Sequence, residues 1–337
     1  MKKKIVLAID IMGGDFGPKT TIEGIALASD LYPNVSYKLF GDSFEADNEL
    51  KKFSGLKNIE VVHTTEMINS SDEPVSALRK LKKSSMRLGI NEVGQKQCDG
   101  FVSAGNTGAL MAISKFVLKT IKGINRPAIA GLMPTLKGQT VILDLGANVD
   151  CTNENLLQFA LMGDVFSKHL LGLKNPKVGL LNIGSEEIKG NSVVKQTYDD
   201  LKKLSKKINF FGFIEGNDIN KGIVDVVVTD GFSGNIALKT AEGVAELIFT
   251  YLKNSYKSSL ISRLGYILSK PALNRFKTRI DPRKYNGAVL LGLNGIVVKS
   301  HGGTDSFGFS NAIGVAISLI ENSYVLEIEK KFNTYRN

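Results

Sequence analysis

Six short apolar segments, each followed by a loop of glycine and short polar residues, set the strongest limit on how this chain folds. They occupy residues 4–9, 100–104, 140–145, 177–183, 224–229 and 295–300. Longer segments with the 3.6-residue period of a helix lie between or after them, for example at 107–121, 155–171 and 235–252. Short, uniformly apolar strands that alternate with helices are typical of parallel sheets. The pattern predicts an α/β fold with a doubly wound, mostly parallel sheet and helices on both faces.

The chain shows no sign of division into separate domains. No low-complexity segment or Pro/Ser-rich linker interrupts its 337 residues, so we expect one large α/β domain over residues 3–332. The two cysteines, Cys98 and Cys151, lie far apart, which fits a reducing cytosol. The first apolar run ends at Asp10, too early for a secretory signal, and no stretch approaches the ~18 apolar residues of a membrane span. We therefore expect a cytoplasmic location.

The loops after the six apolar segments share a composition that suits anion binding. In a parallel sheet such loops lie at the carboxyl ends of the strands, where α/β sheets bind ligands. Each also leads toward a helix N-terminus, whose free N–H groups favour anions. Any one loop is explained equally well by turns and helix caps. For the set, we predict one edge that binds a small anionic or phosphorylated group. Its polar residues are Asp10, Asp15, Asn106, Asp144, Asn148, Asp150, Asn182, Glu186, Glu187, Lys189, Asn235 and His301.

The charge balance and the missing motifs narrow the class of ligand. Lys and Arg outnumber Asp and Glu by 43 to 33, a net charge of +10, which favours an anionic partner. No nucleic-acid-binding motif is present, so nucleic acid is not expected. The chain also lacks the glycine motifs for nucleoside triphosphates and dinucleotides, and the G-x-S-x-G nucleophile elbow. Its histidines are isolated, and we predict neither a metal nor a cofactor.

Several motifs, in order along nearly the whole chain, identify a family. They include "AIDIMGGDFGP", "DGFVSAGNTGALMA", "LDLGANVDC", "LLNIGSEEIKGN", "VVVTDGFSGNIALKTAEG" and "KSHGGTDSFGFSNAI". Over residues 3–332 the chain closely resembles the acyl-acyl-carrier-protein:phosphate acyltransferase family (PlsX). The resemblance implies a Rossmann-like fold similar to phosphate acetyltransferases and isopropylmalate dehydrogenases, and a homodimer. It also implies transfer of a long acyl chain from acyl carrier protein to inorganic phosphate, giving an acyl phosphate for a membrane glycerol 3-phosphate acyltransferase.

The resemblance also assigns roles to residues of the loops. Lys189 is expected to bridge phosphate and the developing oxyanion, Asn235 to donate a hydrogen bond, and His301 to protonate the departing thiolate. Asp10 and Asp15 would fix the glycine loop or orient a cation such as Lys189. Simple capping or solvated side chains remain the alternative for each. The positions expected to bind substrate or phosphate are Asp10, Gly13, Gly14, Asp15, Asn106, Thr107, Asp144, Asn148, Asp150, Asn182, Glu186 and Gly234.

A basic amphipathic segment at residues 253–284 does not look like part of a core. No acidic residue occurs between Leu247 and Ile280, while seven Lys and Arg residues do. The pattern predicts a helix, a break at Pro271 and a second helix, which would lie on a membrane surface. A dimer-interface hairpin or a groove for an acidic partner is the alternative. The expected membrane-facing residues are Leu260, Leu264, Ile267, Leu268, Leu273 and Phe276.

A second basic run, residues 79–89, would dock the acidic acyl carrier protein or is a solvated helix face. Three other functions stay open. One is a phosphate acetyl- or butyryltransferase that uses coenzyme A, and another is a decarboxylating dehydrogenase of similar fold. The third is a non-catalytic scaffold for lipid enzymes, which would leave the six loops without a role.

Overall fold

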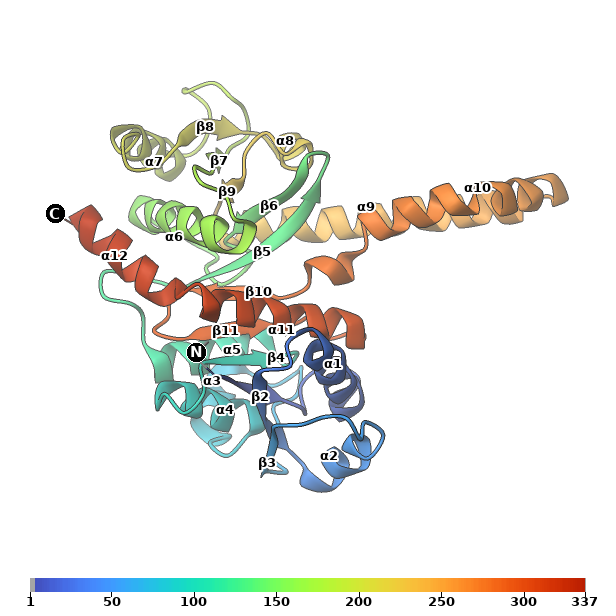
Figure 1. Cartoon of the computed structure of the whole chain (residues 1–337). Helices are drawn as coiled ribbons and strands as arrows, with labels where there is room; N and C mark the ends of the chain where they lie inside the picture. Colours follow the sequence, from blue (N-terminus) through green and yellow to red (C-terminus); the bar gives the residue numbers. More distant parts are fainter. Residues whose placement is uncertain (1–3, 337) are drawn as a thin grey trace.

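The computed structural model describes residues 4–336, so residue 3, where the predicted domain begins, lies outside the described part (Figure 1). These residues form an eleven-stranded sheet in the order β3-β2-β1-β4-β11-β10-β5-β6-β9-β7-β8. The strands are β1 (Ile5–Asp10), β2 (Val35–Gly41), β3 (Ile59–His63), β4 (Gly100–Ser103), β5 (Ala128–Thr135), β6 (Gly138–Leu143), β7 (Val178–Leu181), β8 (Phe210–Ile214), β9 (Val226–Val228), β10 (Ala288–Leu291) and β11 (Ile296–Lys299).

Helices follow most strands, as the alternating pattern predicted. They are α1 (Gly17–Leu31), α2 (Ser43–Leu50), α3 (Pro74–Lys80), α4 (Ser85–Gly94), α5 (Thr107–Leu118), α6 (Asn153–Leu171), α7 (Ser192–Lys203), α8 (Gly216–Lys221), α9 (Gly231–Lys257), α10 (Leu260–Arg279), α11 (Ser306–Glu321) and α12 (Tyr324–Arg336), with a 3₁₀ turn η1 (Pro282–Tyr285). The six apolar segments are β1, β4, β6, β7, β9 and β11, so these predicted strands are confirmed.

Strand direction divides the sheet into two parts. Strands β3, β2, β1, β4 and β11 run parallel to one another, and so do β6, β9, β7 and β8. Between the two parts, the pairs β11–β10, β10–β5 and β5–β6 are all antiparallel. Three reversals leave the second part running opposite to the first. The sheet is mostly parallel, as expected, but it has two directions.

Both faces of the sheet are buried, which explains why its strands are uniformly apolar. Along β1, Leu7 and Ile9 belong to one core cluster and Ala8 to the other, as the two-residue period of a strand requires. Helices α1 and α11 fill the first cluster with residues such as Ile25 and Phe309. Helices α4 and α5 supply the second. Helices therefore cover both faces, which confirms the predicted layers.

Helices α9 and α10 form a hairpin that extends away from the sheet (Figure 1). The predicted break at Pro271 is wrong, because α10 continues through that residue and the chain reverses at Ser258–Ser259. Proline removes one backbone hydrogen bond, but α10 has no buried residue, so water can bond the freed carbonyl. Ser259 instead starts α10 by accepting a hydrogen bond from the Ser262 backbone N–H (3.0 Å).

The two helices of the hairpin hold each other through aromatic side chains. The rings of Phe249 and Phe276 have centroids 6.0 Å apart, and those of Tyr256 and Tyr266 are 5.4 Å apart. Phe276 therefore contributes to the contact between α9 and α10, although we expected it to face a membrane. Within residues 4–336, no helix has both the length and the apolar character needed to cross a membrane.

Candidate active site

The six glycine-rich loops fall into two groups, not one. The loops after β1, β4 and β11 leave one part of the sheet, and the loops after β6, β7 and β9 leave the part that runs in the opposite direction. Our expectation of a single edge is therefore wrong. Its cause is the antiparallel strands β5 and β10, which were not among the predicted strands. We call the two sets the first and second loop groups.

The first loop group is held closely together by backbone contacts. A Cβ atom on Gly13 would lie 2.7 Å from the Gly105 nitrogen, and one on Gly14 would lie 2.9 Å from the Ala104 Cβ. Gly14 also has a φ of +89°, a conformation that favours glycine. The backbone N–H of Asp15 donates to the carbonyl oxygen of Gly302 (3.0 Å). The remaining pocket beside these glycines has a volume of about 10 Å³, room for about one water molecule.

Two predicted binding residues of the first loop group have structural partners. Asp10 is buried and accepts hydrogen bonds from the Ser103 hydroxyl (2.7 Å) and the Met12 backbone N–H (3.2 Å). Burial raises the pKa of Asp10, and these hydrogen bonds oppose the shift. Asn106 caps α5, whose first residue is Thr107, and its amide also donates to the Asp72 carbonyl (3.0 Å).

His301 also lies in the first loop group, away from the loops that carry Lys189 and Asn235. Its ring is exposed, and its Nδ1 accepts a hydrogen bond from the backbone N–H of Gly303 (3.1 Å). Its own backbone N–H donates to the Asn286 side-chain oxygen (2.9 Å). The structure therefore does not bring the three expected catalytic residues into one loop group.

Lys299 is a functional candidate that the sequence analysis missed. Its Nζ donates to the carbonyl oxygens of Ala104 (3.1 Å) and Ser300, and Asp10 and Asp15 are the acidic groups that act on it. Burial lowers the pKa of Lys299 to about 8. We expected these aspartates to fix the glycine loop or to orient a cation such as Lys189, and the cation on which they act is Lys299. A lysine that ends the buried strand β11 was the signal available in the sequence.

The second loop group is built around Asp144, which is completely buried. Its carboxylate accepts hydrogen bonds from the backbone N–H groups of Ile129, Gly146, Ala147 and Asn148, at 2.7 to 3.2 Å. The side chain of Asn148 donates a further bond at 2.8 Å. Burial raises the pKa of Asp144 despite these donors. Asp144 and Asn148 therefore shape the loop after β6.

Asn235 lies in the first turns of α9, directly against that loop. Its Nδ2 donates to the carbonyl oxygen of Leu145 (3.1 Å). A Cβ atom on the neighbouring Gly234 would lie 2.0 Å from the Asp144 carbonyl oxygen, so only glycine lets α9 start this close to β6. Asp150 follows in the same loop, is exposed, and accepts a hydrogen bond at its carbonyl from Arg126 (3.2 Å).

Lys189 lies in the loop after β7, the strand next to β9. Its Nζ is 2.8 Å from a carboxylate oxygen of Glu186, which raises the pKa of Lys189, and both side chains are largely exposed. The side chain of Asn182 donates to the Lys189 carbonyl oxygen (3.1 Å) and so fixes this loop. Because β7 and β9 are adjacent and parallel, Lys189 and Asn235 follow neighbouring strand ends.

The loops that carry these two polar residues also expose large apolar side chains. The exposed set comes from the loops after β6 and β7 and from the start of α9, and comprises Val149, Ile183, Ile188, Phe232 and Ile236. Exposed apolar groups that cluster at a polar site are typical of a site for a ligand with an apolar part. The second loop group therefore combines a cation, an amide donor and an apolar surface.

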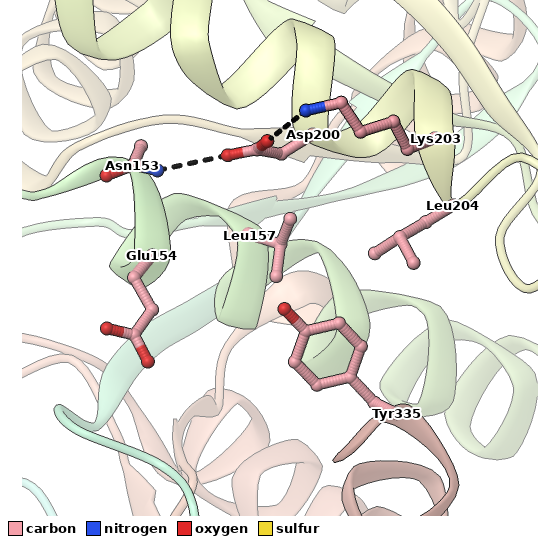
Figure 2. A pocket seen from close by; sticks show the side chains of 7 residues that line it. All are labelled: Asn153, Glu154, Leu157, Asp200, Lys203, Leu204 and Tyr335. Atoms are coloured by element: carbon pink, nitrogen blue, oxygen red, sulfur yellow. Dashed lines mark hydrogen bonds and ion pairs between the residues drawn. The ribbon is translucent and has the colours of Figure 1, made fainter. Parts of the chain in front are cut away.

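A cavity of about 280 Å³ lies elsewhere, between α6, α7 and α12 (Figure 2). Its polar groups already bind one another, since Asp200 accepts hydrogen bonds from both Asn153 and Lys203 at 3.0 Å. Tyr335 and Leu157 supply apolar walls. None of the predicted site residues lines this cavity, and we assign it no part in the reaction.

Comparisons with known proteins decide the family. A family model described as "Fatty acid synthesis protein" matches residues 5–326. The phosphate acyltransferase of Paramagnetospirillum magneticum is 51% identical over 334 residues, which cover 99% of this chain and 95% of that protein. This chain belongs to the phosphate acyltransferase family. The phosphate acyltransferase of Rhodospirillum centenum is also 51% identical, over 96% of this chain and 92% of that protein. The predicted family and the prediction of an enzyme are therefore confirmed.

Solved structures agree with the fold expected for a phosphate acyltransferase. A phosphotransacetylase from Streptococcus pyogenes superimposes with a TM-score of 0.65 at 17% identity, over 94% of each chain. The EutD phosphotransacetylase from Staphylococcus aureus gives 0.61 at 16% identity, over 95% of each chain. At these identities the likeness concerns the fold alone, and it confirms the expected similarity to phosphate acetyltransferases.

Proposed function

We propose that this phosphate acyltransferase moves a long-chain fatty acyl group from acyl carrier protein to inorganic phosphate. The observation that carries the proposal is the second loop group, where Lys189 and Asn235 follow adjacent strands amid exposed apolar side chains. A phosphate ion requires a cation and hydrogen-bond donors, and a fatty chain requires an apolar surface. The group offers both within one set of loops.

The chemistry needs no serine or cysteine nucleophile. An oxygen of the hydrogen phosphate dianion attacks the thioester carbon, the C–S bond breaks, and the proton of the phosphate ends on the leaving thiolate. Lys189 would exchange its exposed ion pair with Glu186 for the phosphate, because exposed pairs contribute only about 0–1 kcal/mol. Asn235 would stabilise the negative charge on the carbonyl oxygen. The mechanism does not need His301 as an acid, because the proton of the phosphate itself reaches the leaving thiolate.

The deciding experiment follows the loss of thioester from palmitoyl-acyl carrier protein with and without phosphate. We expect phosphate-dependent turnover and formation of palmitoyl phosphate. Palmitoyl-coenzyme A and acetyl-coenzyme A are run in parallel. Turnover of the coenzyme A esters alone would favour the phosphate acetyl- or butyryltransferase, and no turnover of any donor would favour the scaffold.

We also propose that the protein is a homodimer that associates peripherally with the cytoplasmic membrane surface. Helix α9 exposes a stripe formed by Val244, Leu247, Ile248 and Tyr251, which a second copy would cover. At the hairpin turn, Leu260 and Ile261 are 81% and 84% exposed beside the basic Lys257 and Arg263. Apolar and basic side chains at one tip suit an anionic bilayer. Such contact would deliver the acyl phosphate to the membrane glycerol 3-phosphate acyltransferase.

A further inference from the structure

Helices α3, α4 and α5, which lie together in the first part of the sheet (Figure 1), carry basic residues that the proposed reaction leaves without a role. The helices pack against one another in the first part of the sheet. No ion pair within residues 4–336 involves these basic residues, which we call the basic face and which are Arg79, Lys82, Lys83, Arg87, Lys115 and Lys119. Many other lysines of the chain do pair with carboxylates, so this face carries an uncompensated positive charge.

An exposed aromatic ring lies among these cations. Phe116 is 53% exposed, and its ring centroid lies 5.0 Å from the Arg87 guanidinium carbon and 4.8 Å from the Lys119 Nζ. Arg87 is half-buried, and its Nη1 has no hydrogen-bond partner among the described residues. An arginine stacked on an aromatic ring, with donor capacity left over, is typical of the residues that dominate binding interfaces.

The basic face is rigidly attached to the first loop group. The Lys83 backbone N–H donates to the Glu66 carboxylate (2.8 Å), and the Lys83 carbonyl accepts from the Thr64 hydroxyl (2.6 Å). Two residues further on, Ser85 is a hydrogen-bond partner of the buried Asp10. These bonds hold the backbone at Lys83 in place next to the first loop group, and the side chains of Lys82 and Lys83 are exposed there.

We propose that this basic face docks the acidic acyl carrier protein that presents the acyl thioester, an inference that rests on the proposed function. Charge complementarity is the argument for this occupant, because acidic side chains of the carrier meet six cations that have no carboxylate ion-pair partner among residues 4–336. A second copy of this chain is disfavoured, since a two-fold interface would place cations against cations. A bilayer is disfavoured as well, because the described residues of α3, α4 and α5 expose two large apolar side chains, Val75 and Phe116, whereas α10 exposes several, among them Leu260, Ile261 and Leu264.

The test compares two double variants of equal charge. Lys82→Glu with Lys83→Glu reverses the basic face, and Lys51→Glu with Lys206→Glu makes the same charge change at exposed lysines elsewhere. We expect the first variant to raise the KM for palmitoyl-acyl carrier protein at least about tenfold, with the KM for phosphate and kcat unchanged. The control should keep both KM values. Equal effects of the two variants would show a general charge effect and overturn the proposal.

Direct binding separates this proposal from the proposed function. The probe is holo-acyl carrier protein without an acyl chain, measured by surface plasmon resonance at low and high salt. We expect wild-type binding to weaken with salt and Phe116→Ala to weaken it at low salt. Wild-type binding without any acyl transfer would refute the function and keep the docking face. Acyl transfer with unchanged binding by the Lys82/Lys83 variant would refute the docking face alone. The Lys82/Lys83 variant could instead keep its affinity for the carrier protein but no longer bind anionic vesicles or no longer dimerise. The occupant of the basic face would then be a membrane or a second copy of the chain, not the carrier protein.

Discussion

Lys299 keeps a positive charge where desolvation opposes it. Its ammonium group donates to two carbonyl oxygens at the ends of β4 and β11, and it faces two aspartates. These bonds add to the backbone hydrogen bond from the Ser300 N–H to the Ser103 carbonyl oxygen (2.8 Å), which already joins the two strand ends. The positive charge of Lys299 also lies close to the backbone loops, where it favours the binding of an anion.

The titration of Lys299 makes stability depend on pH in a defined direction. Its folded-state pKa of about 8 lies below the ordinary value, so between pH 8 and pH 10.5 the unfolded chain binds a proton that the native protein lacks. The wild type should therefore become more stable relative to Lys299→Met as the pH rises through this window, by about 3 kcal/mol. Urea unfolding of both proteins at pH 7.5 and pH 10 measures the change. A constant difference between them would contradict it.

Lys189 and Asn235 should affect catalysis far more than folding. We expect Lys189→Ala to lower kcat/KM by about 10²- to 10³-fold, with a change in unfolding free energy below about 0.5 kcal/mol, because its ion pair is exposed. Asn235→Ala also removes the hydrogen bond to the Leu145 carbonyl, so it should cost about 1 kcal/mol of stability as well. Lys202→Ala, which removes another exposed ion pair with a carboxylate, is the matched control. Normal turnover by the folded Lys189→Ala variant would show that Lys189 has no part in the mechanism.

Sequence patterns identified where polar residues gather, but not which of them are free to bind. Asp10 and Asp144 were expected to contact substrate, yet Asp10 accepts from the Ser103 hydroxyl at the end of β4, and Asp144 accepts from the Asn148 N–H in its own loop. A loop-shaping aspartate and a ligand-binding aspartate have the same sequence environment, since both follow a strand and precede glycine. The difference lies in backbone N–H directions, which exist only once the loop has folded.

At the scale of elements, the α9–α10 hairpin shows what the periodicity of the sequence can predict and what it cannot. The apolar and basic pattern predicted one helix on each side of Pro271, whereas a single helix, α10, spans that residue and its partner α9 ends at Lys257. Pro271 suggested the break, but α10 passes through it, and because the helix has no buried residue, water can bond the carbonyl that proline leaves free. The pattern also could not tell residues that face α9, such as Phe276, from residues at the tip. That distinction depends on how the two helices pair.

The hairpin tip should control membrane binding without changing the chemistry. Replacing Leu260 and Ile261 together with Glu removes two exposed apolar side chains, each worth about 1.5–3 kcal/mol on burial. We expect binding to anionic liposomes to fall at least about tenfold, with turnover of soluble palmitoyl-acyl carrier protein unchanged. Leu31→Glu, at an equally exposed leucine at the end of α1, is the control for sedimentation with liposomes. If the Leu260→Glu/Ile261→Glu variant bound liposomes as well as the wild type, the hairpin tip would be excluded as the membrane contact.

At the scale of the whole molecule, the main error concerned strand direction. Seven of the ten pairings between neighbouring strands are parallel, as the alternating pattern predicted, and the family and fold followed from the motifs. Strands β5 and β10 were not recognised, and together they reverse the second part of the sheet. Two of the three antiparallel pairs, β5–β6 and β10–β11, join strands that follow each other in the chain, and only β10–β5 joins strands that are distant in sequence.

The exposed stripe of α9 predicts the assembly state. We expect sedimentation velocity to give a dimer at micromolar concentration, and Leu247→Glu with Tyr251→Glu to give a monomer, because two charges would enter an apolar contact. Unfolding of the wild type should shift with protein concentration, and that of the variant should not. A monomeric wild type would contradict the proposed dimer and would mean that the apolar stripe of α9 binds something other than a second copy.

The position of β10 and β11 between β4 and β5 also has a consequence for synthesis. The other nine strands are all synthesised before residue 230. They form two half-sheets with no strand pairing between them. Residues 288–299 join the halves, and at about 5–20 residues per second they arrive several seconds later. During that interval the edges of β4 and β5 are open to other chains. The nascent protein thus depends most on chaperones shortly before its translation is finished.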